Sequence, residues 1–340
     1  MLGLDRRALQ ILWTTFLFAL VLAVVYASRH TLMIFTLALF FSHLIAPIVA
    51  FFERTVPAKV PRVAILVLVY VVLLVAIVLL MISIGSRIGE QAVSLGARLS
   101  QVVNQADPLS GLPLPEWLLQ FLKDRVGDLE QHVLPILSTA GMQIVNGVGN
   151  VLSTILIPIL SFFFLKDGAA IRKGIVDSFS HANQTVVNEI IVDLHLLLAQ
   201  YIRALVLLSI STFIFYTGFL SIAGAPYAIL LAGIAALFEF IPVVGPLTSS
   251  VAIVLVAAFT GYPHLWWLVI FLASYRIFQD YVLNPYLMSS GVEVHPLLVL
   301  FGVLAGEQIA GVPGMFFSVP VIAAVRVIFV RLRRQKRVAA

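Results

Sequence analysis

The stretch FEFIPVVGP, residues 238–246, interrupts a long apolar run with two prolines, a glycine and a carboxylate. Proline lacks a backbone N–H and its ring clashes with the preceding helical turn, so residues 227–260 cannot form one continuous helix. We expect two half-helices of about 15 residues, each about 22 Å long and shorter than the ~30 Å hydrocarbon core of a bilayer. Interrupted backbone is tolerated at membrane depth only where protein or a water-filled cavity satisfies its polar groups. The break and its acid, Glu239, are therefore predicted to form part of a transport site.

The composition places the chain among membrane proteins. Of its 340 residues, 61% are hydrophobic and 11% are charged, which is far too apolar for a soluble protein. The net charge of +5 does not indicate nucleic-acid binding, since the basic residues lie beside apolar runs rather than in a stripe. The absence of cysteine excludes a disulfide framework and a cysteine metal site. We predict an all-α, polytopic helical membrane protein with about eight membrane elements.

Charges beside the apolar runs predict the topology of the N-terminal transmembrane part, residues 1–85. Its first two apolar runs are separated only by an Arg-His pair, so we expect a retained helical hairpin rather than a cleaved signal. A third span is expected over residues 63–84. The loop before this span is basic and is expected in the cytoplasm, together with the N-terminus; it carries Arg54, Lys59 and Arg62.

Residues 86–147 form the one sizeable polar insertion. It carries four basic and six acidic residues, whereas the whole chain carries 21 and 16, so we expect it on the extracytoplasmic face. Its first part is predicted to be an amphipathic helix, because apolar residues recur at spacings of four and three. This seam either packs on the membrane domain or contacts another subunit; it consists of Ile88, Ala92, Leu95, Leu99 and Val102.

The middle of the chain returns to the cytoplasm. Residues 148–182 are expected to hold the fourth span and a cytoplasmic loop rich in basic residues. Residues 183–203 are predicted to be a cytoplasmic amphipathic helix that lies along the inner surface and then turns into the fifth span. On its polar side, Glu189, Asp193 and His195 are interpreted as a solvated face rather than as metal ligands. We expect no metal site and no cofactor.

The transport core is predicted to span residues 204–330, followed by a basic cytoplasmic tail, 331–340. It holds a second interrupted hairpin, 296–330, whose break carries Gly311, Pro313 and Gly314. Counting crossings, the hairpin 227–260 starts from the outer face and the hairpin 296–330 from the inner face. They are therefore an inverted pair, whether each is re-entrant or crosses the membrane fully. The alternative is that both breaks merely kink packed helices.

Polar residues in and beside these breaks are the candidate pathway. We expect Glu239 and Glu307 to carry ions or protons, because an acid at the centre of a membrane helix costs about 2.5 to 3.5 kcal/mol and is rarely retained without a role. For each acid, the alternative is a structural carboxylate paired with a hydroxyl or an amide. Gln279, Asn284 and Gln308 are expected to contact solute, and Asp280 to pair with Arg276 four residues earlier. The break-forming residues are Pro242, Gly245, Pro246, Pro285, Gly311, Pro313 and Gly314.

Several short motifs occur in a characteristic order over residues 160–325. They are FLKDG (164–168), IPVVGP (241–246), the stretch 279–285, HPL (295–297), GVPGM (311–315) and VP (319–320). In this order they resemble the autoinducer-2 exporter family of bacterial inner-membrane permeases, also called PerM-like. The resemblance implies a multi-pass permease of the bacterial cytoplasmic membrane, a homo-oligomer and specifically a pentamer, that exports autoinducer-2 or exchanges sodium for protons. Val243 and Ala204-Leu205 depart from the residues frequent in the family and bear on substrate identity.

The predicted function is secondary transport, with export of a small polar solute across the lipid bilayer. Coupling to H+ or Na+ is left open, and a sodium/proton antiporter and a passive oligomeric channel are the alternatives. ATP is excluded as the energy source because the sequence has no Gly-rich phosphate loop of the Walker type. An intramembrane protease would need a nucleophile with its base, or paired acids, and no such signature is present, so we expect no enzyme and no catalytic residue.

Overall fold

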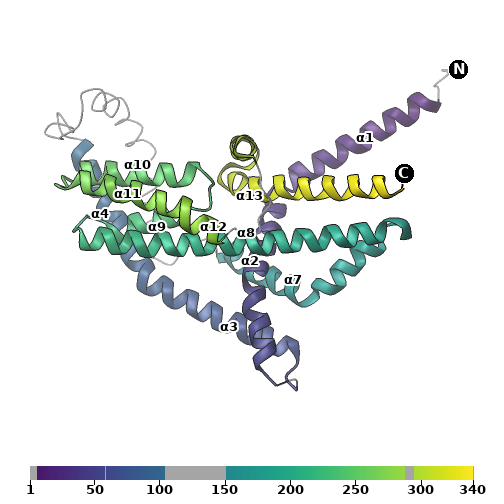
Figure 1. Cartoon of the computed structure of the whole chain (residues 1–340), viewed down its shortest axis with the longest axis horizontal. Helices are drawn as coiled ribbons and strands as arrows, with labels where there is room; N and C mark the ends of the chain where they lie inside the picture. The colour runs from purple at the N-terminus through teal and green to yellow at the C-terminus, as the bar shows by residue number, and fades with distance from the viewer. Residues whose placement is uncertain (1–5, 58, 104–150, 288–294, 340) are drawn as a thin grey trace.

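The computed structural model describes residues 6–57, 59–103, 151–287 and 295–339, and every element in these ranges is a helix (Figure 1). The all-α prediction is therefore confirmed for the described residues. In chain order the elements are α1 (Arg6–Ala27), α2 (Arg29–Thr55), α3 (Arg62–Leu80), the π-helix η1 (Met81–Gly85), α4 (Ser86–Val103), α7 (Val151–Asp177), α8 (His181–Ile222), α9 (Ala228–Phe238), α10 (Val244–Phe259), α11 (Leu265–Phe278), the π-helix η3 (Gln279–Leu283), α12 (Asn284–Leu287) and α13 (Pro296–Ala339).

Five helical stretches of the described chain are long and apolar enough to cross a bilayer, and this confirms a polytopic membrane protein. Two further apolar helices, α9 and α10, are shorter, as expected for the arms of an interrupted hairpin. The predicted fourth span falls in α7, and the residues just before this helix lie outside the described ranges. The five stretches are Gln10–Ala27, Arg29–Thr55, Arg62–Gln101, His181–Ile222 and Pro296–Gln335.

The helix α8 corrects one expectation. Its 42 residues form one continuous helix, about 63 Å long at 1.5 Å per residue, so the predicted turn near residue 203 is absent. The physical reason is that this sequence contains no proline and no glycine before Gly218, so nothing interrupts the helical hydrogen bonds. Because 63 Å is about twice the hydrocarbon thickness, α8 is long enough to cross the bilayer and extend beyond it.

The seam of the insertion helix packs within the chain. In α4, Ala92, Leu95 and Leu99 form a buried cluster with Leu230 of α9 and Phe259 of α10. The side chain of Gln91 adds a polar contact, because its Oε1 accepts the backbone N–H of Leu230 at 2.9 Å. This N–H belongs to the first turn of α9 and has no partner inside the helix, so Gln91 caps it. For the described part of the insertion, the packing alternative is therefore confirmed.

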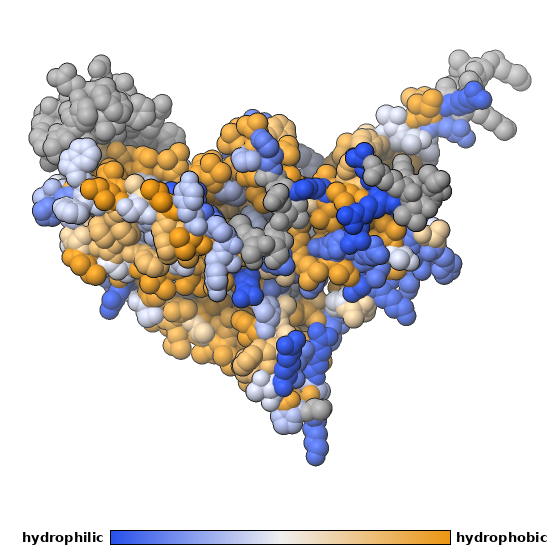
Figure 2. Space-filling model, in the orientation of Figure 1, coloured by the Kyte–Doolittle hydropathy of each residue, from blue (hydrophilic) through white to orange (hydrophobic). Residues whose placement is uncertain are grey.

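The long axis of the molecule follows α8 (Figure 1). One half of α8 lies beside α9, α10 and α11. The four helices share a buried core that includes Leu220, Leu231 and Leu268. The other half lies beside the last part of α13, at the end of the molecule where both chain termini are found. Figure 2 shows apolar residues over most of this face, and hydrophilic residues at the end with the termini and around the turn between α2 and α3.

Candidate functional site

The first break contains five residues between α9 and α10. Its backbone geometry is unusual at Val243, and it requires a glycine at position 245, just after the break. Val243 has a φ of +65°, a conformation that β-branched residues rarely adopt. Gly245 fits because it has no side chain: a Cβ at this position would overlap the carbonyl oxygen of Phe238. The predicted interruption is therefore present, with Glu239 as the first residue after α9.

Glu239 is held inside the protein by neutral groups. Its side chain is only 7% exposed, and Thr212 Oγ1 donates to its Oε1 at 3.0 Å. The amide Nε2 of Gln279 donates to the other oxygen, Oε2, at 2.7 Å. Thr212 and Gln279 are themselves almost fully buried. A carboxylate removed from water is stabilised by such donors, and here both of its oxygens have one.

A π-helical turn carries Gln279. In η3 the backbone N–H of Asn284 donates to the carbonyl of Gln279, five residues back, instead of four. Pro285 explains this widening, because a proline ring clashes with the carbonyl four residues before it and leaves that group without an N–H partner. Arg276, before the turn, forms an ion pair of 2.9 Å with Asp280 inside it, and Asn284 Nδ2 donates to Asp280 Oδ1 at 3.2 Å. Pro285 thus lies at a distorted turn, not at a gap between helices.

A cavity of about 590 Å³ lies beside Glu239. Its walls come from α8, the first break, the segment from α11 to α12, and the second arm of α13. Cavities of this size hold small molecules, and mostly apolar walls with a few polar groups are typical of ligand sites. The lining residues with polar or charged side chains are Asp193, Gln200, Tyr201, Glu239, Arg276, Gln279 and Asn284.

The second break lies within α13, where Ala310 and Gly311 leave helical geometry. Gly311 has a φ of +62°, and the chain changes direction here, as Figure 1 shows. The two arms meet at Gly306 and Gly314, since a Cβ on either glycine would overlap the backbone of the other. The second arm lines the cavity with Val319, Pro320, Ala323 and Val327, whereas the break itself does not line it.

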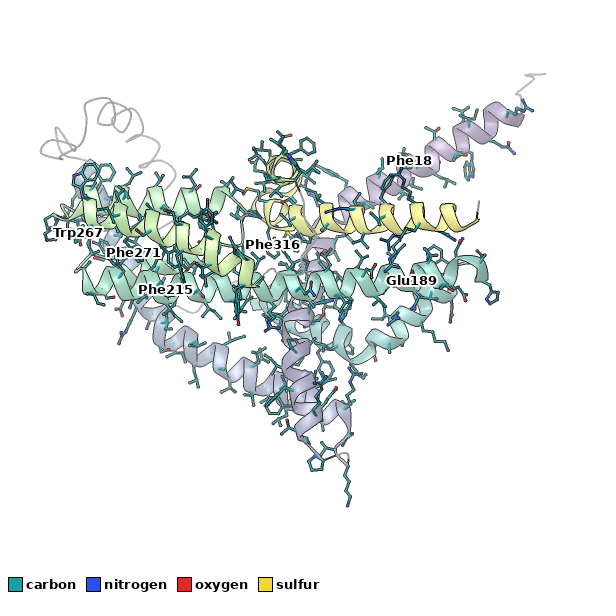
Figure 3. All side chains as sticks on the ribbon, in the orientation of Figure 1. Phe18, Glu189, Phe215, Trp267, Phe271 and Phe316 are labelled. Atoms are coloured by element: carbon teal, nitrogen blue, oxygen red, sulfur yellow. The ribbon has the colours of Figure 1, made fainter. Side chains whose placement is uncertain are left out.

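An ion-pair cluster connects α8 to the second arm of α13. Arg331 donates from Nε to Asp193 Oδ2 and from Nη1 to Glu189 Oε2, both at 2.6 Å. Asp193 also lines the cavity, and Val327 lies one helical turn before Arg331, so the cluster is at one end of the cavity. Figure 3 places Glu189 toward one end of the long axis and Trp267 at the other, with Phe316 between them. The acids interpreted as a solvated face therefore have a basic partner.

The structure brings together three of the six predicted pathway residues. Glu239, Gln279 and Asn284 line the cavity, and Asp280 contacts two residues that line it, Arg276 and Asn284. Glu307 and Gln308 do not line the cavity; they are exposed on the first arm of α13. Among the break-forming residues, Pro242 and Pro246 line the cavity and Gly245 permits the close turn. No group of three or more His, Cys, Asp or Glu that could hold a metal occurs among the described residues.

Sequence reasoning missed three residues of this site. Thr212 contacts Glu239 directly, Tyr275 contacts Thr212, and Arg331 pairs with Asp193. A signal for Thr212 existed, because it lies on α8 at helical spacing from Leu205 and Leu208, which line the cavity. The neighbouring Ser209 and Ser211 are equally polar, however, and the sequence alone does not say which of them faces the break.

The fold and the cavity define a multi-pass helical membrane protein with a solute-sized cavity beside a broken helix. The family model described as AI-2E family transporter matches residues 15–334, and the chain belongs to this family. It is similar to the candidate transport protein YueF of Bacillus subtilis (strain 168), with 26% identity over an alignment of 345 positions that covers 95% of this chain and 93% of YueF.

Two further relatives match part of the chain. The candidate transport protein YrrI of Bacillus subtilis (strain 168) is 24% identical over an alignment of 196 positions that covers 56% of each chain. The candidate transport protein MJ1177 of Methanocaldococcus jannaschii is 27% identical over 194 residues, covering 55% of this chain and 57% of MJ1177. The family and these relatives support a role in membrane transport.

Proposed function

We propose that this protein is a secondary transporter that exports a small polar solute through the cavity beside Glu239. The observation that carries the proposal is a buried carboxylate, at a helix break, on the wall of a cavity of about 590 Å³. Transporters commonly place solute and ion sites where interrupted helices meet near the middle of the membrane. The family match and the motif resemblance support an autoinducer-2-like signalling molecule as the solute.

The position of the cavity fits loading from the cytoplasm. Its α8 wall runs from Leu208 to Asp193, toward the end of the molecule that carries both termini and the basic last part of α13. Basic residues beside membrane spans favour the cytoplasmic side. We therefore propose that both termini are cytoplasmic, that the membrane is the bacterial cytoplasmic membrane, and that this state of the protein is open inward. A homo-oligomer is proposed on the resemblance alone.

Flux in proteoliposomes tests the transport proposal. The purified protein is reconstituted, and release of autoinducer-2 and of a panel of small polyhydroxylated solutes is followed with and without an imposed pH or Na+ gradient. We expect a solute whose flux rises when one gradient is applied, and no comparable flux from protein-free liposomes. Equal fluxes with and without both gradients would assign the protein to passive channels, and Na+ exchange for H+ without any solute would assign it to antiporters.

A further inference from the structure

Thr212 lies at the centre of a short chain of hydroxyl groups. Its Oγ1 is 3.0 Å from Glu239 Oε1 and also 3.0 Å from the hydroxyl of Tyr275. The Thr212 side chain is 0% exposed and Tyr275 is 4% exposed, so water does not replace either partner. A threonine hydroxyl carries one proton to donate and can accept as well. Thr212 therefore donates to only one of its two partners at a time.

The donor and the acceptor in each of these hydrogen bonds depend on the charge of Glu239. When Glu239 is a carboxylate it only accepts, so Thr212 donates to Oε1 and Tyr275 must donate to Thr212. When Oε1 carries a proton, Glu239 becomes a donor, Thr212 accepts from it, and Thr212 donates to the Tyr275 oxygen instead. Gln279 occupies Oε2 as a donor, which favours Oε1 as the oxygen that gains the proton. One proton is added to the carboxylate, and the two hydroxyl hydrogens only rotate.

We propose that Thr212 and Tyr275 are positioning residues: their reversible hydrogen-bond chain lets Glu239 gain and lose a proton without moving any heavy atom. This proposal rests on the proposed transport function, in which Glu239 carries charge. If the partner of Glu239 could only donate, as a lysine does, it would stabilise the charged form of Glu239 and oppose the protonated form. A hydroxyl chain keeps every member bonded in both states.

Among the charged and titratable groups in this region, we expect Glu239 to be the one whose protonation changes with pH. Arg276 and Asp280, from the helix segment beside Gln279, form an ion pair with each other and so add little net charge. Tyr216 of α8 packs against the Tyr275 ring at a centroid distance of 5.1 Å. From α13, the residues that line the cavity are all apolar: Val319, Pro320, Ala323 and Val327.

Two substitutions separate this hydrogen-bond chain from simple packing, because they are expected to shift the titration midpoint of Glu239 by different amounts. Thr212→Val keeps the side-chain shape and removes the donor to the carboxylate, which favours the protonated form. We expect the pH midpoint of Glu239 titration to rise by about one unit, since hydrogen bonds to charged groups are the stronger ones. Tyr275→Phe removes one hydrogen bond in each state, because Tyr275 donates to Thr212 when Glu239 is charged and accepts from it when Glu239 is protonated. We therefore expect a much smaller shift of the midpoint than in Thr212→Val.

The midpoint is measured in two ways on the full-length protein in liposomes. The first is the pH dependence of solute flux, and the second is infrared difference spectroscopy of the carboxyl band that is lost in Glu239→Gln. Thr212→Ser, which retains the hydroxyl, should restore the wild-type midpoint in both measurements. Size-exclusion chromatography checks that each variant folds. If Thr212→Val misfolds, Thr212→Ser and Tyr275→Phe still test the proposed hydrogen-bond chain.

The outcomes distinguish this proposal from the transport proposal. A midpoint that moves as far in Tyr275→Phe as in Thr212→Val, or a Thr212→Val midpoint that does not move, overturns the hydrogen-bond chain. Failure of Thr212→Ser to restore the midpoint overturns it as well. If flux is independent of pH while the infrared midpoints shift as expected, the proposed hydrogen-bond chain is supported. In that case the proposal that transport is coupled to protons is wrong.

Discussion

Glu239 is the residue on which the proposed mechanism depends, and its charge can be removed without changing its shape. In Glu239→Gln the amide still offers hydrogen bonds to Thr212 and Gln279, so we expect normal folding and normal solute binding. Because no proton is bound or released at residue 239, we expect flux to lose its dependence on pH or Na+ gradients. The measurement is proteoliposome flux with and without an imposed gradient.

Glu307→Gln is the matched control for this prediction. Glu307 lies beside a helix break, like Glu239, but it is exposed and does not line the cavity. We expect this variant to keep the gradient dependence of the wild type. If Glu239→Gln keeps it as well, Glu239 is not the carrier and the passive-channel alternative gains support. If only Glu307→Gln loses it, the carrier is Glu307.

The sequence predicted the acid and the amides of this site but not its hydroxyls, and the reason is physical. A carboxylate inside an apolar stretch is costly, so Glu239 stands out from its neighbours. A threonine or tyrosine costs little there, because its hydroxyl can bond to backbone or to a neighbouring helix. Thr212 and Tyr275 acquire their importance only from the contact between α8 and α11, which no local pattern contains.

The break between α9 and α10 is predicted to depend on Gly245. A Cβ at residue 245 would overlap the carbonyl oxygen of Phe238, so Gly245→Ala must push the two half-helices apart. Since Glu239 and the cavity-lining prolines lie at this turn, we expect flux to fall by about tenfold or more while the protein still inserts, a rough figure for misplaced site residues. Flux and membrane insertion are measured in parallel.

Gly218→Ala provides the control for this substitution. Gly218 lies inside the continuous helix α8, and a Cβ added there would meet no atom of a neighbouring segment within 4 Å. Alanine favours helices over glycine by about 1 kcal/mol, so this variant should fold at least as well as the wild type and transport normally. Wild-type flux from Gly245→Ala would show that the shape of the first break is not needed for transport.

At the scale of elements, proline and glycine decided which predictions held. The break near residue 242 coincides with Pro242, and the break near residue 311 with the positive φ of Gly311. Proline alone does not decide, since Pro47, Pro158 and Pro320 lie inside helices that continue. The turn expected near residue 203 rested only on a change from amphipathic to apolar composition, and such a change does not break a helix. The π-turn η3 could not be read from sequence, since Pro285 is compatible with a kink, a gap or a widened turn.

At the scale of the whole molecule, the two interrupted hairpins contribute unequally to the cavity. The first provides its break, with Glu239 and two prolines, whereas the second provides the wall formed by its second arm. Arg331 then ties this wall to α8 through Asp193 and Glu189. The two breaks were predictable from proline and glycine in the sequence, but this division of roles depends on packing between segments more than 100 residues apart in sequence.

The sidedness of the chain is predicted from its charges and is open to a direct test. We expect the insertion, 86–147, outside and the loop after the fourth span inside, because basic residues favour the cytoplasm. The chain contains no cysteine, so a single introduced cysteine gives an unambiguous label. Ser110→Cys tests the insertion, in a part of the chain outside the described residues. Ala169→Cys tests α7, where residue 169 is exposed.

In intact cells, an impermeant maleimide is expected to label Ser110→Cys and not Ala169→Cys. After the membrane is permeabilised, both variants should react, which shows that a lack of labelling in intact cells reflects sidedness and not burial. Labelling of Ala169→Cys from outside, with Ser110→Cys protected, would reverse the orientation of every span. The cavity along the α8 segment from Asp193 to Leu208 would then open to the exterior, and the same site would be placed for uptake rather than export.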